Sequence, residues 1–243
     1  MKKLLKLLKG HKYLCFMDFE GTQFSHEMIG LGAVFASINP KNGRIKKAKK
    51  PIHILVKAKN KIGKYVVDLT GITEEQLKKE GVSFRTALTE LKKYTGLNFK
   101  KTTFITFGNH DLRILSQSIM YNMDFPKEIC SQIQKNYMDF AAFISDFIRD
   151  QNGNPLSLVH YCDLFEVKES GPAHDPTVDA VNLMNLYDAF LEKSELVLKE
   201  YKVLLQRPNR HLPKPVAEAI VKLASGKDVS AKEFENGLKD YLS

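Results

Sequence analysis

The segment from Tyr13 to Met17 is a short and almost continuous run of apolar and aromatic residues, which is typical of a buried β-strand. It leads directly into two acidic residues, Asp18 and Glu20, on either side of Phe19. Because residues two apart on a strand point to the same side, both carboxylates should project together while Phe19 faces the core. Two like charges on one face are costly unless a cation neutralises them. For this pair alone, an ordinary polar strand end is the alternative.

A second strand pattern runs from Lys101 to Phe107, where six of the seven residues are β-branched or aromatic. Gly108-Asn109 interrupts it, and helical apolar spacing follows from Asp111 to Met120. This order predicts Asp111 in the first turn of a helix, at the edge of a sheet where open α/β folds keep their sites. Capping of the helix by Asn109 or Asp111 is the alternative interpretation.

A third polar pair, His174 and Asp179, follows a turn formed by Gly171 and Pro172. Pro176 suits the first turn of a helix, which the apolar spacing extends from Thr177 to about Leu191. Asp179 would then lie about one turn into the helix, with His174 on the loop before it. A capping or solvated histidine is the alternative.

Taken together, the three motifs resemble those of the DEDDh 3′–5′ exonuclease superfamily: Asp-x-Glu, a single Asp, and His-x-x-x-x-Asp. The resemblance spans roughly residues 12–192 and favours the subgroup of histone-mRNA- and siRNA-trimming exoribonucleases and sporulation-inhibitor-like exonucleases. Two departures are Pro176, where relatives have a small residue, and His110 directly before Asp111. Three further segments match the family pattern: Glu27 to Val34, Val67 to Thr73, and Tyr137 to Phe140.

The resemblance implies an α/β fold of the ribonuclease-H-like, layered kind. It has a mixed central sheet flanked by helices, and its first three strands form a meander. Residues 1–195 would form the exonuclease domain and residues 196–243 a small helical C-terminal extension, which includes a Pro-rich linker from Gln206 to Pro213.

The resemblance also implies a mechanism that uses two divalent cations, Mg²⁺ or Mn²⁺. Asp18 would bridge both ions, Glu20 and Asp179 would complete the site of the nucleophilic water, and Asp111 would hold the second ion. His174 would be the general base, since imidazole titrates near neutrality.

The implied reaction releases nucleoside monophosphates from single-stranded nucleic acid, with RNA as the expected substrate. A proofreading-type DNA exonuclease is the nearest rival. Two further interpretations are a catalytically silent nucleic-acid-binding module with the same fold and a phosphohydrolase of small nucleotides.

Positive charge is concentrated at the start of the chain, which carries a net charge of +9. Residues 1–61 hold 14 Lys and Arg against three acids, a local charge of +11, so the remainder carries −2. We expect a hairpin from Ile38 to Lys50 that turns at Asn42-Gly43 and places Arg44, Lys46 and Lys47 beside the site, where they would bind phosphates. Lysines that protect a solvated strand edge are the alternative.

The residues after the first motif are expected to contact the 3′-terminal nucleotide. By family resemblance, the backbone and hydroxyl around Gly21 and Thr22 would contact its sugar. Phe24 would stack on a base if it is exposed; a core position for Phe24 is the alternative.

Composition limits what else the chain can be. With 43% apolar residues among 243, the chain can bury one sizeable core plus a small appendage. No apolar stretch approaches the roughly 20 residues that span a membrane. The first ten residues form an amphipathic lead-in that could touch a membrane surface or a partner. Cys15, Cys130 and Cys162 are expected to be buried thiols of a cytoplasmic protein. A homodimer is left open.

Overall fold

The computed structural model describes residues 2–168, 170–172, 174–207 and 212–242, so the middle half of the expected linker from Gln206 to Pro213 lies outside the described residues. The chain forms two compact units. Unit 1 comprises Met1–Phe143 and Ser157–Glu192, and unit 2 comprises Ile144–Leu156 and Lys193–Ser243. The division expected after residue 195 lies near the start of the second stretch of unit 2. The sequence-based boundary, however, placed Ile144–Leu156 in the exonuclease domain. In the structure this segment belongs to unit 2, where Phe147 packs against Tyr201 with ring centroids 5.5 Å apart.

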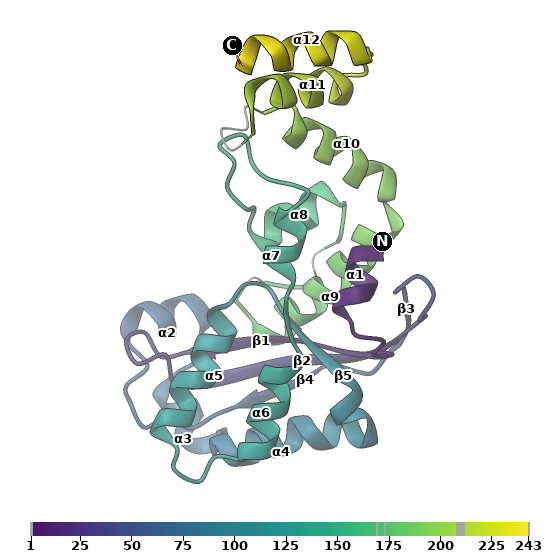
Figure 1. The fold of residues 1–243 in the computed structure, drawn as a ribbon. Helices are drawn as coiled ribbons and strands as arrows, with labels where there is room; N and C mark the ends of the chain where they lie inside the picture. Colours follow the sequence, from purple (N-terminus) through teal and green to yellow (C-terminus); the bar gives the residue numbers. More distant parts are fainter. Residues whose placement is uncertain (1, 169, 173, 208–211, 243) are drawn as a thin grey trace. The chain divides into compact units, whose positions relative to one another are not determined.

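Unit 1 is built on a mixed sheet of six strands in the order β3-β2-β1-β5-β6, with β4 also paired to β2 (Figure 1). The first strands pair in antiparallel fashion, whereas β5 and β6 run parallel to β1. This arrangement confirms the predicted fold class and the meander of the first three strands. The strands are β1 (Tyr13–Gly21), β2 (Met28–Ile38), β3 (Ile45–Ala48), β4 (Ile52–Leu55), β5 (Thr102–Thr106) and β6 (Tyr137–Asp139).

Helices cover both faces of this sheet, and unit 2 is largely helical (Figure 1). Those that lie within unit 1 are α1 (Lys2–Leu7), α2 (Lys64–Thr70), α3 (Glu74–Glu80), α4 (Phe84–Thr95), α5 (His110–Tyr121), α6 (Lys127–Lys135), α8 (Leu158–Leu164) and α9 (Pro176–Glu192), with a 3₁₀ helix at Gly96–Lys101. Helix α7 (Phe140–Ser145) crosses from unit 1 into unit 2, which also contains α10 (Ser194–Leu205), α11 (Lys214–Ala224) and α12 (Ala231–Leu242).

Alternation along β1 divides its side chains between two cores. Cys15, Met17 and Phe19 are buried in a cluster with residues of α4, α5 and α6. Phe16 points the other way, where its ring lies 5.3 Å from that of Tyr187 on α9. Since side chains alternate on a strand, Asp18 shares the α9 face with Phe16. The carboxylates therefore project between β1 and α9, as the sequence pattern predicts.

The expected hairpin forms, but its turn and its position differ from the prediction. The chain reverses between Asn39 and Arg44, where the Gly43 N–H donates to the Asn39 carbonyl at 2.7 Å. Asn42 does not have the positive φ that a two-residue turn would require of it.

The register then places the hairpin at the far end of the sheet. Lys47 pairs with Ser37, and Ser37 pairs with Tyr13, the first residue of β1. Asp18 lies five residues further along β1, or about 17 Å at the usual rise of a strand. The expectation that this hairpin lies beside the site is therefore wrong.

Other features follow the sequence closely. The three cysteines are free and buried. Thr73 and Gln76 form a capping box at the start of α3, where the segment from Val67 to Thr73 ends. Leu4 and Leu8 of the amphipathic lead-in are buried. None of the helices in the described ranges is long and apolar enough to cross a membrane.

Candidate active site

Four acidic side chains from three elements lie near the end of β1, close enough for their charges to interact. Asp18 and Glu20 come from β1, Asp111 from the first turn of α5, and Asp179 from the first turn of α9. Their charges act on one another: Asp111, Glu20 and Asp179 each raise the pKa of Asp18. The fold thus brings together all four carboxylates that the motifs singled out.

Burial makes this cluster electrostatically costly. Desolvation is the largest cause that raises the pKa of Asp18 well above its usual value, followed by the charge of Asp111. Burial, followed by the charges of Asp179 and Asp111, raises the pKa of Glu20 to about 8. A cluster whose members resist ionisation is one that a cation would stabilise strongly.

Asp111 is fixed by the backbone of the first motif. Its Oδ1 accepts a hydrogen bond from the Phe19 N–H at 2.7 Å, and the residue is 5% exposed. Burial raises the pKa of Asp111 to about 7, although this hydrogen bond opposes the shift. No side-chain capping bond is found at the start of α5, so the capping interpretation of Asn109 is not supported.

Asp139 stabilises the loop at Gly108, which precedes Asp111. Its Oδ1 accepts from the Gly108 N–H at 3.0 Å and from the Ala142 N–H at 2.9 Å. The Tyr137 hydroxyl donates to the Gly108 carbonyl at 2.6 Å. The segment from Tyr137 to Phe140 matches the family pattern, but the local sequence does not reveal the roles of Asp139 and Tyr137, because these depend on the pairing of β6 with β5.

The third motif is held by its own carboxylates. Asp175 Oδ1 accepts from the backbone N–H of Thr177 at 2.8 Å and of Val178 at 3.3 Å, so Asp175 caps α9. Asp179 Oδ2 accepts from the His174 N–H at 3.0 Å. His174 is exposed and adopts a left-handed backbone with φ of 64°. The backbone hydrogen bond couples the position of His174 to that of Asp179.

Two glycines of β2 make room for this helix start. Pro176 begins α9, and its backbone lies against Gly32, where a Cβ atom would overlap the Pro176 carbonyl group and the Thr177 nitrogen. Gly30, two residues earlier, lies near the Pro176 ring. Gly32 pairs with Asp18 across the strands. The departure at Pro176 is therefore accommodated, since a glycine in a strand often marks such a close approach.

The four carboxylates are donors that suit a divalent cation, although their side chains do not surround a common point at which a cation could bind. Oxygen-only ligands favour magnesium or manganese. Burial first, and neighbouring acidic side chains second, raise the pKa values of Glu20 and Asp111, and a bound cation would favour their ionised forms. In the described part of the chain, no group of three or more His, Cys, Asp and Glu side chains is arranged to hold a metal ion. Like-charged carboxylates repel one another without a counter-ion, which favours such separated positions.

The residues after the first motif differ in accessibility. Phe24 is 82% exposed, which meets the condition set for a stacking role. Thr22 is 1% exposed, and its hydroxyl accepts from the Glu27 N–H at 2.9 Å and bonds to Ser25. Gly21 is partly exposed at the end of β1. Of the predicted substrate contacts here, Phe24 is the most accessible.

The basic residues predicted to bind substrate are placed elsewhere. Arg44 donates from Nε and Nη2 to the two carboxylate oxygens of Asp188, both at 2.8 Å, and also pairs with Glu192. Its guanidinium therefore ties the hairpin to α9. Lys46 and Lys47 are exposed on β3, at the opposite end of β1 from Asp18.

Solved structures with the same fold include several exonucleases. The nuclease domain of 3′hExo, a DEDDh family member bound to rAMP, is 18% identical with a TM-score of 0.59, over 75% of this chain and 92% of that one. Cell-death related nuclease 4 (CRN-4) is 19% identical with a TM-score of 0.59, over 75% and 64%. E. coli Exonuclease I in complex with a dA16 oligonucleotide is 15% identical with a TM-score of 0.57, over 81% and 44%.

Family membership is shown by the sequence itself. No curated protein matches the chain significantly in sequence. The model of the RNase_T exonuclease family matches residues 15–187, which include every residue of the three motifs. The chain belongs to the RNase_T exonuclease family, which confirms the DEDDh resemblance drawn from its motifs.

Proposed function

We propose that this chain is a 3′–5′ exonuclease that uses two divalent cations, Mg²⁺ or Mn²⁺, and releases nucleoside monophosphates from single-stranded RNA. The observation that carries the proposal is the meeting of Asp18, Glu20, Asp111 and Asp179 at one sheet edge, where burial and mutual repulsion raise carboxylate pKa values. Metal-dependent phosphodiester cleavage needs such a cluster of acidic ligands.

Asp18, Glu20, Asp111 and Asp179 would hold the cations. Two divalent cations at this edge would supply Lewis-acid stabilisation of the charge that develops on the phosphate oxygens during in-line displacement. The protein keeps Asp111 in place through the Phe19 N–H and keeps Asp179 close through α9.

His174 would act as the general base. Its imidazole accepts a proton from the water that attacks the terminal phosphorus, while the bond from phosphorus to the 3′ oxygen of the preceding nucleotide breaks. The leaving 3′ oxygen takes a proton from solvent, so the products are a nucleoside 5′-monophosphate and a strand with a new 3′ hydroxyl. The exposed position of His174 on the loop before α9 leaves its ring accessible to a substrate. Phe24 and the backbone at Gly21 would contact the terminal nucleotide.

Several similar structures support RNA as the substrate. The 3′hExo nuclease domain was solved bound to rAMP, and a related 3′-exonuclease structure concerns recognition of the histone mRNA stem-loop. This chain covers 92% of the former but only 44% of the Exonuclease I chain bound to DNA. The proofreading-type DNA exonuclease is the second candidate, since Exonuclease I shares the fold.

Matched RNA and DNA 20-mers, labelled at either end, test the proposal in Mg²⁺, Mn²⁺ or EDTA. Mononucleotides released from the 3′ end, and abolished by EDTA or by Glu20→Gln, would support it. Glu90→Gln, which changes an exposed acid on α4, is the matched control and should cleave normally. Faster loss of the DNA strand would favour the second candidate. Strand binding without cleavage in any metal would identify a catalytically silent binding module.

A further inference from the structure

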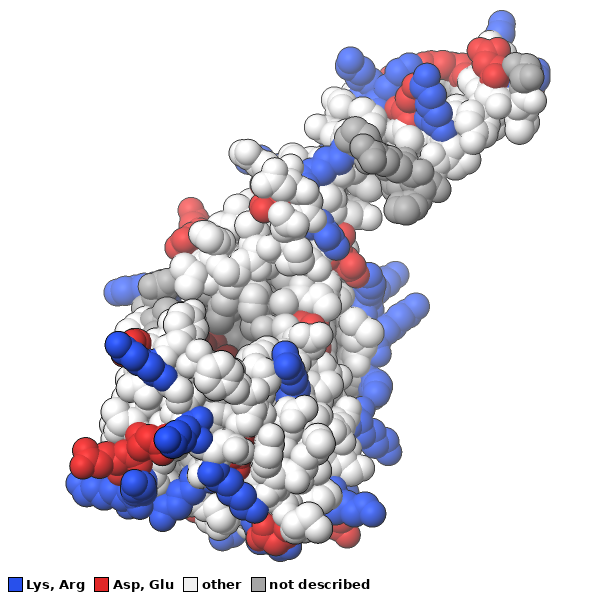
Figure 2. Space-filling view, turned by 90° about the vertical axis from the view of Figure 1, so that its left-hand side faces the viewer, with Lys and Arg blue, Asp and Glu red and all other residues white. Residues whose placement is uncertain are grey.

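A lysine-rich loop joins β4 to α2, on the side of the sheet where β1 ends. The segment from Lys57 to Lys64 contains four lysines and no acid, and all four side chains are exposed. In the described part of the chain, no acidic side chain forms an ion pair with any of them. Figure 2 faces this side of the molecule and shows several Lys and Arg side chains on its lower half, with Asp and Glu side chains among them. The four lysines are Lys57, Lys59, Lys61 and Lys64.

Two carboxylates, the buried Glu27 and the exposed Glu74, hold the backbone of this loop. Glu27 is 1% exposed, and its Oε2 accepts from the backbone N–H groups of Lys59 and Asn60 at 2.9 and 3.0 Å, and from the Asn60 side chain at 3.1 Å. Glu74 Oε1 accepts from the Ile62 N–H at 2.9 Å. These acids therefore fix the loop through its backbone. The Lys59 ammonium donates to the Tyr121 carbonyl at 2.5 Å, whereas the side chains of Lys61 and Lys64 are exposed.

The loop is joined directly to the segment that follows the first motif. The Gln23 N–H donates to the Ile62 carbonyl at 2.8 Å. Gly63 lies so close to Gln23 that a side chain on Gly63 would clash with it. Two exposed aromatic residues flank this junction, Phe24 at 82% and Tyr65 at 65% exposure. The exposed Lys64 and Tyr65 are thus neighbours in a segment that is hydrogen-bonded to Gln23, three residues after Glu20.

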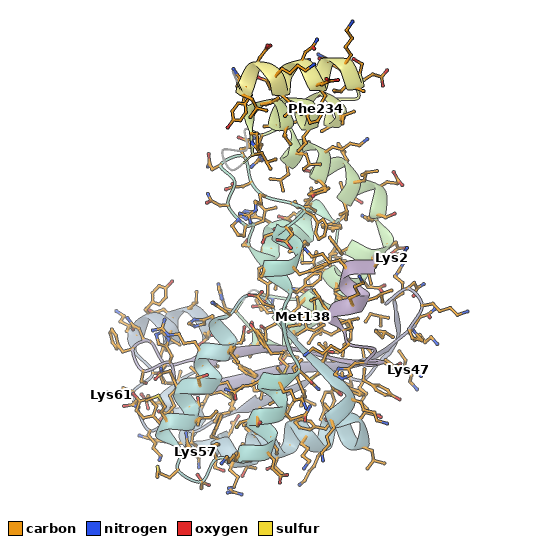
Figure 3. The ribbon with its side chains drawn as sticks, viewed as in Figure 1. Lys2, Lys47, Lys57, Lys61, Met138 and Phe234 are labelled. Carbon is orange, nitrogen blue, oxygen red and sulfur yellow. The ribbon has the colours of Figure 1, made fainter. Side chains whose placement is uncertain are left out.

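We propose that Lys61, Lys64 and Tyr65 form a track for the part of the strand that lies 5′ of the nucleotide being removed. The proposal rests on the proposed 3′–5′ exonuclease function. Lysines neutralise backbone phosphates without reading sequence, and aromatic rings stack on successive bases. Figure 3 shows Lys61 on the same side of unit 1 as Lys57, and Lys47 at the opposite end of the sheet. The loop thus takes the role that the sequence led us to expect of the hairpin.

The experiment compares steady-state cleavage of a 4-mer and a 20-mer over a range of salt concentrations. In Lys61→Ala/Lys64→Ala, the KM for the 20-mer should rise towards that of the 4-mer, with kcat unchanged. The slope of log KM against log salt should fall by about 1.4, since each phosphate contact on a single strand contributes roughly 0.7. Tyr65→Ala should raise the KM for the 20-mer about tenfold without changing the slope.

Two further variants keep the test specific. Lys92→Ala/Lys93→Ala removes the same charge from exposed positions on α4 and should leave both KM and slope as in the wild type. An unchanged KM and slope in Lys61→Ala/Lys64→Ala would overturn the track. So would a loss confined to Lys46→Ala/Lys47→Ala, which would assign the strand to the hairpin.

Failure of the proposed function would look different. A wild-type protein that cleaves no strand in any metal would overturn that function and not the track. Fluorescence anisotropy of a labelled 20-mer with the same variants would then test the track by binding alone. Equal affinity and equal salt slope in wild type and Lys61→Ala/Lys64→Ala would again overturn it.

Discussion

Gly32 of β2 lies directly against Pro176, the first residue of α9, with no room for a side chain between them. Because Gly32 is the strand partner of Asp18, this contact sets how closely the helix that carries Asp179 approaches the first motif. Gly32 thus takes part both in the pairing of β2 with β1 and in the packing of α9 on the sheet. The geometry of the acidic cluster depends on this glycine although it carries no functional group.

Gly32→Ala should therefore inactivate the enzyme while the sheet remains folded. The added methyl would overlap backbone atoms of Pro176 and Thr177, so α9 must shift away from β1. Overpacking of this kind costs about 1–3 kcal/mol of stability. We expect a loss of kcat of at least about 100-fold, since a displacement of about 1 Å at a site can have that effect. Far-UV circular dichroism and steady-state kinetics measure the two consequences.

Gly30→Ala is the matched control, two residues earlier on the same strand. Its methyl would approach the Ile72 Cδ1 atom at 3.1 Å, the end of a side chain that can move aside. Wild-type kcat in Gly32→Ala would show that α9 is not held at this point. Pro176→Ala should not rescue Gly32→Ala, because the overlap is with the backbone.

Asp111→Asn should stabilise the metal-free protein, and more so at high pH. Burial raises the pKa of Asp111 to about 7 in the folded state, above its value in an unfolded chain. A group with a raised folded pKa contributes its stability below the unfolded pKa, and that contribution is lost as pH rises through about 7. In EDTA at pH 8.5, the variant should therefore melt higher than the wild type.

The same comparison at pH 5 provides the check on sign. There Asp111 is largely protonated in the folded protein, so the difference in Tm should shrink. The asparagine keeps an oxygen that can accept from the Phe19 N–H, so this hydrogen bond is not the cause of any change. A variant that melts lower than wild type at pH 8.5 would contradict the electrostatic interpretation.

Mg²⁺ or Mn²⁺ should raise the Tm of the chelator-treated protein at pH 8. A ligand that binds only the folded state stabilises it by mass action, and a cation here would also relieve the repulsion among Asp18, Glu20 and Asp111. Asp18→Asn should abolish most of this increase. Differential scanning fluorimetry with a metal titration measures it, and an equal increase in wild type and variant would place the cation elsewhere.

His174→Ala should lower kcat by about 100- to 10,000-fold, the usual range for loss of a general base. The fold should be unaffected, because His174 is exposed and the hydrogen bond from its backbone N–H to Asp179 remains in alanine. Imidazole added to the assay should restore part of the activity. His53→Ala, at an exposed position on β4, is the control. Wild-type rates in His174→Ala would refute the assignment of the base.

Local patterns predicted the parts of the site that depend on neighbouring residues. The alternation from Phe16 to Glu20 determined which face the carboxylates share, and Pro176 marked the first turn of α9. Each of these signals lies within a few residues of the feature that it predicts.

Contacts between distant residues could not be predicted in the same way. Arg44 is bound by Asp188, 144 residues further along the chain, and nothing near Arg44 reveals that partner. The position of Lys47 depends on how β3 pairs with β2 and how β2 pairs with β1. The excess of positive charge in residues 1–61 was evident from the sequence, but only the fold distinguishes the loop beginning at Lys57 from the hairpin.

Glu27→Gln should release the lysine-rich loop from unit 1. Three N–H donors meet at Glu27 Oε2, while Oε1 is buried and has no hydrogen-bond partner among the described residues. An amide keeps one acceptor oxygen but places an unpaired NH₂ group at the other position, and burial of an unpaired polar group costs about 1–3 kcal/mol. Trypsin should therefore cut the native variant after Lys59 and Lys61 faster than it cuts the wild type, as mass spectrometry of the fragments would show. Glu90→Gln controls for the loss of one carboxylate, and equal cleavage rates in all three proteins would show that Glu27 does not hold the loop.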